Sequence, residues 1–356
     1  MQASIQRCFE RGFPFAVYRI PGKEPRLLVQ TDGALRSFIP GDPFPLEKGY
    51  LMIPFHPSRA EPAYMLSPDI LLSEDRPEQL PEGEASYSGW MPSPVIVEED
   101  RKSYVKKVEK VRDTIRKVEG LEKVVLSRSE RADKEAASSP WELFQRLDSL
   151  YPEAFVHLFH IPGQCTWTAA TPELLLELDG EEARTQALAG TRPKGEGVEW
   201  TEKERREQAS VEEHIASVLE EHGIPLRGRR GPETVDAGNI QHLSTRFVFS
   251  GEAVQKAPSA FIRDLHPTPA VCGLPRDRAM ELIEATEARS RSFYAGAIGP
   301  WGVEGEHALY VNLRCARIWK EVIELFVGGG INDGSDPEKE WEETVRKAGT
   351  VRRAFS

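Results

Sequence analysis

The sequence predicts an α/β protein built on an antiparallel or mixed β-sheet with helices outside it. Its strand-like runs follow one another through tight turns, as at Asp179-Gly180 and Trp319-Lys320, and such turns join neighbouring antiparallel strands. Strict alternation of strand and helix, which marks a parallel sheet, is not the dominant pattern. The 356 residues suffice for two domains or for one large α/β unit.

The composition is that of a globular protein, with 39% hydrophobic and 29% charged residues. The 46 basic residues are outnumbered by 57 acidic ones, which gives a formal charge of −11. An acidic chain argues against a general nucleic-acid binder, whereas an anionic small substrate needs only local positive charge. No window approaches about 18 consecutive apolar residues, so we expect no membrane association through a spanning helix.

The four cysteines, at positions 8, 165, 272 and 315, are far apart and form no CxxC pair. Neither a zinc ribbon nor a disulfide scaffold is therefore predicted. The N-terminal sequence lacks the apolar run of a signal peptide. We expect a cytoplasmic, reduced protein.

Residues 1–95 are rich in Pro and Gly and carry only short apolar runs. Short strands and long loops are expected there, as part of the same unit as residues 96–356. The acidic, proline-rich segment 73–94 is expected to be an exposed connection.

Residues 96–356 carry clear helix and strand signals. Helices are predicted over 104–115, 201–222 and 277–290, and a last one from Asp336-Pro337, where an Asp cap and a Pro in the first turn fit. Strands are predicted at 123–128, 154–161, 165–170, 173–178, 183–188, 245–251, 292–298, 307–318 and 321–327.

The strand at 123–128, with the sequence KVVLSR, places a lysine beside a β-branched run. Lys123, Val125 and Ser127 share one face of that strand. A lysine on a partly buried face is unfavourable unless it has a partner or a function, and one such function is general-base catalysis. The competing interpretation is a lysine at a strand end that extends to solvent, and this segment alone favours it.

The helix at 201–222 directs an acid towards its apolar side. Glu207 falls on the helical wheel with Val211, Ile215 and Val218. Such a carboxylate is paired with a base, bound to a cation or catalytic, or it is an edge group that reaches solvent.

The last helix carries Glu340, Glu343 and Lys347 along one side. Periodicity alone predicts that this side is solvated. A loop is predicted at Gly328-Gly329-Gly330, where backbone amides could face an anion, although a plain turn explains the glycines equally well.

Three further positions have two interpretations each. Glu173 follows Thr171-Pro172 at a strand start and is either a site acid or an ordinary edge acid. Arg314 lies among apolar strand residues, where a guanidinium faces either a ligand carboxylate or a structural salt bridge. His266, in the segment HPTPA, is equally ambiguous alone.

Taken together, these segments resemble the chorismate-utilising enzymes, and among them the isochorismate synthases. The matching pieces occur in the family order and cover about residues 100–350, whereas residues 1–95 match only loosely. They are KVVLSR at 123–128, ATPELL at 170–175, ALAGTR at 187–192, EKERRE at 202–207, HPTPAVCG at 266–273, YAGAIG at 294–299, LRCARI at 313–318, GGGI at 328–331 and EWEET at 340–344.

The resemblance implies a large sandwich of two mainly antiparallel β-sheets with outer helices. It also implies Mg²⁺-dependent chemistry on chorismate, with Glu207 and Glu343 as Mg²⁺ ligands and Glu340 near the metal. Carboxylates suit this hard cation, which keeps several waters. For Glu343, this replaces the solvated side that periodicity predicts.

The resemblance further assigns roles in the reaction. Lys123 matches the general base that activates water for attack at C2 of the ring, and Glu173 matches the general acid that protonates the departing C4 hydroxyl. The substrate-contacting positions it implies are Gly190, His266, Arg314, Lys347 and the 328–330 amides, including those of Gly328 and Gly329.

Related enzymes on the same substrate form the alternatives. Aminodeoxychorismate synthases place a nucleophilic lysine where this chain has Ala189, which leaves water as the nucleophile. Salicylate synthases share the base lysine and an LAGT-like segment, so isochorismate formation followed by pyruvate elimination is the nearest alternative. A catalytically silent binding protein of the same fold is a third.

Three residues of this chain depart from the family pattern. Gln208, Ala169 and Cys272 stand where histidine, glycine and serine are common in the family. A monomer is expected, because the catalytic set is complete in one chain. The product would feed menaquinone or siderophore biosynthesis.

Overall fold

The computed structural model describes residues 1–355 except 33, 40–47, 74–79, 81–88, 97, 134–138, 196–198 and 238–239. Most of the predicted connection at 73–94 lies outside the described residues. The described part contains eight helices. They are α1 (Gln2–Arg11), α2 (Arg101–Lys117), α3 (Pro140–Leu150), α4 (Glu202–Glu221), α5 (Gly251–Lys256), α6 (Pro258–Leu265), α7 (Arg276–Thr286) and α8 (Pro337–Arg352).

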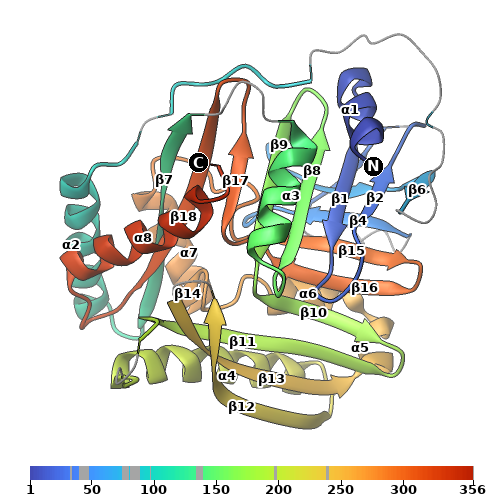
Figure 1. Ribbon diagram of the computed structural model, residues 1–356. Coiled ribbons are helices and arrows are strands. Elements are labelled where there is room, and N and C mark those ends of the chain that lie inside the picture. The colour runs from blue at the N-terminus through green and yellow to red at the C-terminus, as the bar shows by residue number, and fades with distance from the viewer. Residues whose placement is uncertain are drawn as a thin grey trace.

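Two antiparallel sheets, each with nine described strands, form the centre of the molecule (Figure 1). The first sheet has the order β14 (Gly273–Leu274), β7 (Lys123–Asp133), β18 (Val322–Ile331), β17 (Cys315–Ile318), β9 (Cys165–Thr171), β8 (Phe155–Ile161), β1 (Phe15–Arg19), β2 (Arg26–Val29) and β6 (Ile70–Leu72). The second has the order β12 (Leu226–Ala237), β13 (Ile240–Ser250), β11 (Glu182–Pro193), β10 (Leu174–Asp179), β16 (Glu306–Val311), β15 (Ala297–Val303), β4 (Gly49–Ile53), β5 (Ala63–Leu66) and β3 (Arg36–Phe38). The predicted fold class, two mainly antiparallel sheets with helices, is confirmed.

Aromatic side chains join the two sheets. The rings of Tyr18 and Tyr50, from β1 and β4, have centroids 5.6 Å apart. Phe155 from β8 stacks on Tyr310 from β16 at 4.2 Å. These buried rings belong to the larger of two apolar cores, and burial of such side chains is the main favourable term in folding.

Helices cover the outer sides of the sheets, as Figure 1 shows. Helices α1 and α3 pack on the first sheet over a second apolar core that includes Phe9 and Phe144, and α8 lies on β18. Helix α4 lies on β11 and β13 of the second sheet. The apolar side predicted for α4 is buried at Val211, Ile215 and Val218.

The N-terminal segment supplies strands to both sheets, because β1, β2 and β6 join the first and β3, β4 and β5 join the second. The prediction of strands and loops alone was wrong at residues 2–11, which form α1. Only Ile5, Cys8 and Phe9 of this polar helix are buried, so its apolar periodicity is short.

The predicted strand at 307–318 is two strands in different sheets. Strand β16 ends at Val311 in the second sheet, and β17 begins at Cys315 in the first. Between them Asn312 is buried and donates to Phe293 O at 2.9 Å, and Arg314 adopts a φ of 49°. This left-handed residue turns the chain from one sheet to the other, which an apolar sequence pattern cannot reveal.

Two other predictions need correction. Residues 292–296 are not a strand, because β15 begins only at Ala297 and Ser292 and Ala295 have positive φ angles. Gly328, Gly329 and Gly330 do not form a loop. They lie in β18, paired with Ser127, Leu126 and Val125 of β7.

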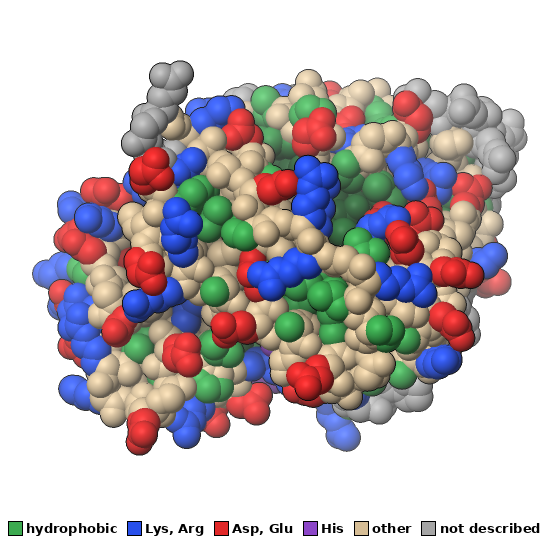
Figure 2. Space-filling model, turned by 90° about the horizontal axis from the view of Figure 1, so that it is seen from below, with side chains coloured by type: hydrophobic (Ala, Val, Ile, Leu, Met, Phe, Trp, Pro, Cys, Tyr) green, Lys and Arg blue, Asp and Glu red, His purple; other side chains and the backbone are tan. Residues whose placement is uncertain are grey.

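None of the helices in the described ranges is both long and apolar enough to span a membrane. On the face shown in Figure 2, basic and acidic side chains are interspersed over the surface. The four cysteine thiols are all buried and free.

Candidate active site

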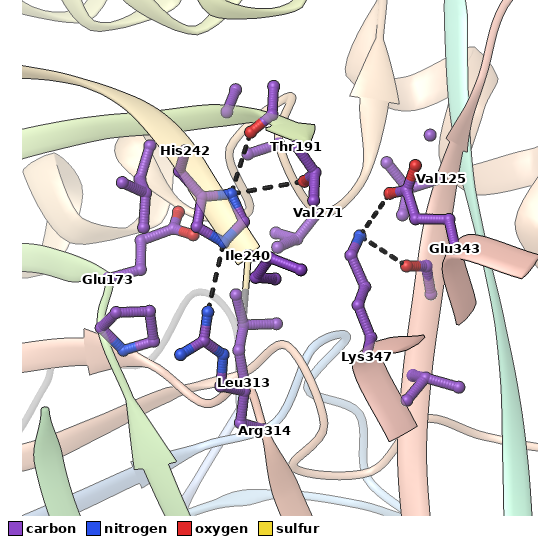
Figure 3. Close-up of a pocket in the computed structure, with 18 of the residues that line it drawn as sticks. Val125, Glu173, Thr191, Ile240, His242, Val271, Leu313, Arg314, Glu343 and Lys347 are labelled. Atoms are coloured by element: carbon purple, nitrogen blue, oxygen red, sulfur yellow. Dashed lines mark hydrogen bonds and ion pairs between the residues drawn. The ribbon is translucent and has the colours of Figure 1, made fainter. Parts of the chain in front are cut away.

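A cavity of about 110 Å³ brings most of the predicted site residues together. It lies where β7 and β18 of the first sheet approach β11 and β13 of the second, with α4 and α8 beside it (Figure 3). The predicted residues that line it are Lys123, Glu173, Gly190, Glu207, Arg314, Gly328, Glu343 and Lys347.

Lys123 enters the cavity through a space that a glycine provides. Lys123 is only 6% exposed. Val125, predicted to share its face of the strand, also lines the cavity. A Cβ at Gly330 on the paired strand would lie 2.7 Å from Lys123 Cε and 3.6 Å from Glu207 Oε1. The absence of a side chain at position 330 is therefore what lets the lysine extend towards the cavity and Glu207.

Glu173 lies between β9 and β10 and is 2% exposed. Its Oε1 has no hydrogen-bond partner among the described residues. Burial raises the pKa of this carboxyl to about 8, although the charges of Lys123 and Lys347 oppose the shift. Glu173 is therefore mainly protonated at neutral pH and can donate a proton into the cavity.

His242 on β13 connects two predicted substrate contacts (Figure 3). One guanidinium nitrogen of Arg314 lies 3.2 Å from His242 Nε2, and His242 Nδ1 lies 2.9 Å from the carbonyl oxygen of Gly190. Because a guanidinium only donates, Nε2 accepts from Arg314 and Nδ1–H donates to Gly190. Burial and the charge of Arg314 keep the ring neutral by lowering the pKa of His242 to about 3.

Arg314 forms no ion pair with an acidic side chain among the described residues, so the competing interpretation of a structural salt bridge is not supported there. Burial lowers the pKa of its guanidinium to about 10, which leaves it cationic at neutral pH. A cationic fork that faces a cavity without a carboxylate partner is suited to an anionic ligand.

Gly190 requires glycine for its backbone. It has a φ of 61°, and a Cβ there would lie 3.0 Å from the Cβ of Glu204 on α4. Thr201 and Glu204 form the capping box that starts this helix. The close approach fixes α4, and with it Glu207, against β11.

Two lysines neutralise the predicted metal ligands. Lys347 Nζ lies 2.8 Å from Glu343 Oε1 and donates to the carbonyl of Gly328 at 3.0 Å. Lys203 Nζ lies 2.6 Å from Glu340 Oε1 and 4.0 Å from Glu207 Oε1. Despite burial, the charge of Glu340 raises the pKa of Lys203, so its ammonium is retained.

The pKa values of Glu340 and Glu343 shift in opposite directions. Burial raises the pKa of Glu340, which Lys203 opposes. At Glu343 burial also favours the neutral form, but Lys347 outweighs it and lowers the pKa. Glu340 is 2% exposed, and its Oε2 has no hydrogen-bond partner among the described residues.

The chemistry of this donor set fits Mg²⁺. In the described part of the chain, no three acidic, His or Cys side chains converge closely enough to enclose a metal. Mg²⁺ nevertheless takes only one or two protein carboxylates and completes its shell with water and substrate. Hard oxygen donors at Glu207 and Glu343, which both line the cavity, meet that requirement, and Lys203 and Lys347 hold cationic charge beside them.

The remaining predicted residues lie outside the cavity wall. Gly329 faces the other side of β18, because a Cβ there would lie 3.4 Å from Glu340 Oε2. Glu340 is linked to the cavity through Lys203. His266 is not brought to this cavity and lines a separate one, although Ala270 and Val271 of the same segment do reach it.

Sequence reasoning missed His242 and Lys203. His242 precedes the predicted strand at 245–251, whereas β13 begins at Ile240. The period-two spacing of Ile240 and His242, which both line the cavity, was the available signal. For Lys203 the signal was its i, i+4 spacing to Glu207 on α4.

Comparisons with known proteins identify the family of the chain. Residues 73–356 match the family described as chorismate binding enzyme. Isochorismate synthase EntC of Escherichia coli is 32% identical over 247 residues, which are 66% of this chain and 62% of that protein. An anthranilate synthase component 1 of Haloarcula marismortui is 30% identical over 267 residues, 69% of this chain and 52% of that protein.

The alignments thus span less than two thirds of the length of these relatives. The structure of MenF, the menaquinone-specific isochorismate synthase of Escherichia coli, superposes with a TM-score of 0.75 at 22% identity, covering 97% of this chain and 89% of that one. Identity this low shows a shared fold. The family match, which includes every predicted site residue, shows that the chain belongs to the chorismate-binding enzymes.

Proposed function

We propose that this protein is an isochorismate synthase, which converts chorismate to isochorismate with water as the nucleophile. The observation that carries the proposal is the cavity in which Lys123 and a protonated Glu173 face the same space as two cationic side chains, Arg314 and Lys347. A base, an acid and holders for an anionic ligand are what this reaction needs. The relatives named isochorismate synthase support it.

The proton transfers balance within this set. As the general base, Lys123 takes a proton from water while the water oxygen bonds to C2 of the ring. The two ring double bonds shift, the bond from C4 to its hydroxyl breaks, and Glu173 gives its proton to the leaving oxygen. One water is consumed and one released, so the net reaction is an isomerisation, and the two residues exchange roles in reverse.

Anchoring the substrate falls to the cationic residues. Arg314, oriented by His242, is assigned to one substrate carboxylate, and Lys347 to carboxylate binding beside Glu343. Such fixed contacts hold the ring so that C2 faces Lys123 and C4 faces Glu173, which contributes to the rate through orientation.

Glu207 and Glu343, with Glu340 beside them, are the proposed holders of Mg²⁺, which supplies charge stabilisation at the ring carboxylate when bound. The chain's own part is to keep these carboxylates together through Lys203 and Lys347. A metal held by these carboxylates would compete with Lys203 and Lys347 for them.

Proton NMR of the purified protein with chorismate and Mg²⁺ tests the proposal. New ring signals with the enolpyruvyl signals retained are the expected result. Free pyruvate with an aromatic product would instead identify a salicylate synthase. An unchanged spectrum from folded protein would overturn the proposal in favour of a silent binding protein. The Lys123→Met variant is the control, and it should leave chorismate unchanged.

A further inference from the structure

A second cavity, of about 260 Å³, shares none of its described lining residues with the catalytic cavity. It lies between strands β3–β5 of the second sheet and helices α6 and α7. Its walls are mainly apolar and include Phe38, Ile53, Phe55, Ile262 and Met280. A cavity of about 150 Å³ with such a lining is known to admit benzene, so this one can hold a substituted six-membered ring.

His266 is the polar group of this cavity that most needs a partner. The residue is 6% exposed, and neither ring nitrogen has a hydrogen-bond partner among the described residues. Buried polar groups in native proteins nearly always have a partner, and leaving one without costs about 1–3 kcal/mol. Two unsatisfied nitrogens in an otherwise apolar wall indicate a place where a ligand's polar group sits.

The charges of the lining favour an anion. Among the lining residues, Arg263 and Arg276 contribute two guanidinium groups and Asp277, 3.7 Å from Arg276, contributes one carboxylate. Asp264, which is not in the lining, lies 3.6 Å from Arg263. His56, also in the lining, pairs with Glu284 at 2.6 Å. Burial first, and then the charge of Arg276, lower the pKa of His266 to about 3, so its neutral ring can donate one hydrogen bond beside a cation.

The segment that carries His266 also reaches the catalytic cavity. Ala270 and Val271 line that cavity. The chain between is a tight turn, in which Thr268 O accepts from Val271 N at 3.1 Å and from Cys272 N at 3.0 Å. β14 follows and pairs with Lys123 and Val124. A shift of His266 is therefore transmitted over a few stiff residues to the catalytic wall.

We propose that this second cavity binds a small aromatic carboxylate, with the ring against Phe38 and Phe55 and the acid group between His266 and Arg276. Occupancy then acts on the catalytic cavity through residues 266–271, a consequence that rests on the proposed function. Binding of the aromatic carboxylate does not rest on the proposed function, because it can be measured without turnover.

Fluorine NMR titration with 4-fluorobenzoate as the probe tests the binding. The wild type and Arg314→Met, which alters only the catalytic cavity, should bind the probe with similar affinity. Arg276→Met should weaken it about tenfold and His266→Phe about fivefold, the sizes of a charge-assisted and a neutral hydrogen bond. Arg278→Met is the matched control, because Arg278 lies on the same helix but donates to Glu119 O outside the cavity, and it should bind as the wild type does.

Two results would overturn the proposal. One is the absence of probe binding to wild-type protein whose circular dichroism shows it folded, which would mean that only water satisfies His266. The other is weakening by Arg314→Met without weakening by Arg276→Met or His266→Phe, which would place the probe in the catalytic cavity. If the probe binds the second cavity, we expect it to change KM for chorismate in the wild type. The same concentration of probe should leave KM unchanged in Arg276→Met.

Discussion

The guanidinium of Arg314 donates to Nε2 of His242 across 3.2 Å, which ties the crossover between β16 and β17 to strand β13 of the second sheet. The same ring donates from Nδ1 to Gly190 O at 2.9 Å. Two positions on separate segments of the cavity wall, Arg314 and Gly190, are thus held by one neutral imidazole. Arg314 is positioned by this contact, and not by a salt bridge within the described residues.

His242→Phe keeps a ring in place but removes the acceptor for Arg314. Because a hydrogen bond to a charged group contributes about 1.5–3 kcal/mol, KM for chorismate is expected to rise about tenfold or more. Thr191→Val is the matched control, since Thr191 Oγ1 makes only a 3.3 Å contact with the same ring. Steady-state kinetics of the two variants distinguish them, and equal effects would contradict the role assigned to His242.

Glu173→Gln removes the acidic proton and preserves the shape of the side chain. Loss of general-acid catalysis is expected to lower kcat by about 10²–10⁴-fold. In wild type the rate should fall as the pH rises through about 8, because Glu173 must be protonated and burial raises its pKa to about 8. Rate profiles between about pH 6 and pH 10 check this, and a descending limb that persists in Glu173→Gln would assign it to another group.

The same carboxyl affects stability. Its folded-state pKa of about 8 lies above the ordinary value of 4.5, so the native state binds more protons between these values. The free energy of unfolding of wild type therefore decreases as pH rises through that window. Glu173→Gln escapes this loss, and its midpoint of urea unfolding should exceed that of wild type at about pH 9 by more than at about pH 5. An equal difference at both pH values would contradict the buried-acid assignment.

Gly330→Ala tests the route by which Lys123 reaches the cavity. The added Cβ would lie 2.7 Å from Lys123 Cε, so the lysine must move, and displacement of a catalytic group by about 1 Å can cost about 10²-fold in rate. The Cβ added by Gly329→Ala on the same strand would point to the opposite side of β18, where its nearest neighbour is Glu340 Oε2 at 3.4 Å. This variant should lose much less of its catalytic rate. A smaller loss for Gly330→Ala than for Gly329→Ala would sink this interpretation.

Lys203→Met leaves the buried carboxylate of Glu340 without its 2.6 Å partner. We expect the metal-free variant to lose about 1–2 kcal/mol of stability, less than for a fully buried pair because Lys203 is partly exposed. Mg²⁺ should raise its melting temperature more than that of wild type, since the acids no longer have a competing ammonium. Arg206→Met on the same helix, which loses only an exposed pair with Glu202, should behave as wild type in both measurements.

Periodicity predicted most of the fold correctly. The strands of residues 155–193 and helix α4 appear where apolar spacing placed them. Helix α8 starts at Pro337 with Asp336 accepting from Glu338 N at 3.0 Å, as the predicted cap requires. Helix α3 was not predicted, although Ser139 and Glu142 form a capping box at its start.

Other features have no local signature. The positive φ of Arg314 depends on the two sheets it connects, because nothing in its own side chain favours a left-handed backbone. The glycines at 328–330 suggested a loop by composition, but they serve a paired strand past which Lys123 and Glu340 must fit. Tertiary contacts decide both cases.

For the site, the sequence motifs identified residue types and could not supply distances. Eight predicted residues share one cavity, whereas His266 lies in another because residues 266–271 extend from one cavity to the other. The roles given to Lys123, Glu173 and the metal carboxylates remain predictions that the variants above test.

The origin of the new hydroxyl oxygen tests most directly whether water is the nucleophile. Isochorismate made from unlabelled chorismate in water enriched in oxygen-18 should carry one labelled oxygen at C2, as mass spectrometry of the product can show. That result would mean that solvent water attacks C2 while the C4 hydroxyl departs. Isochorismate without the label would mean that the original hydroxyl migrates, and it would contradict the mechanism.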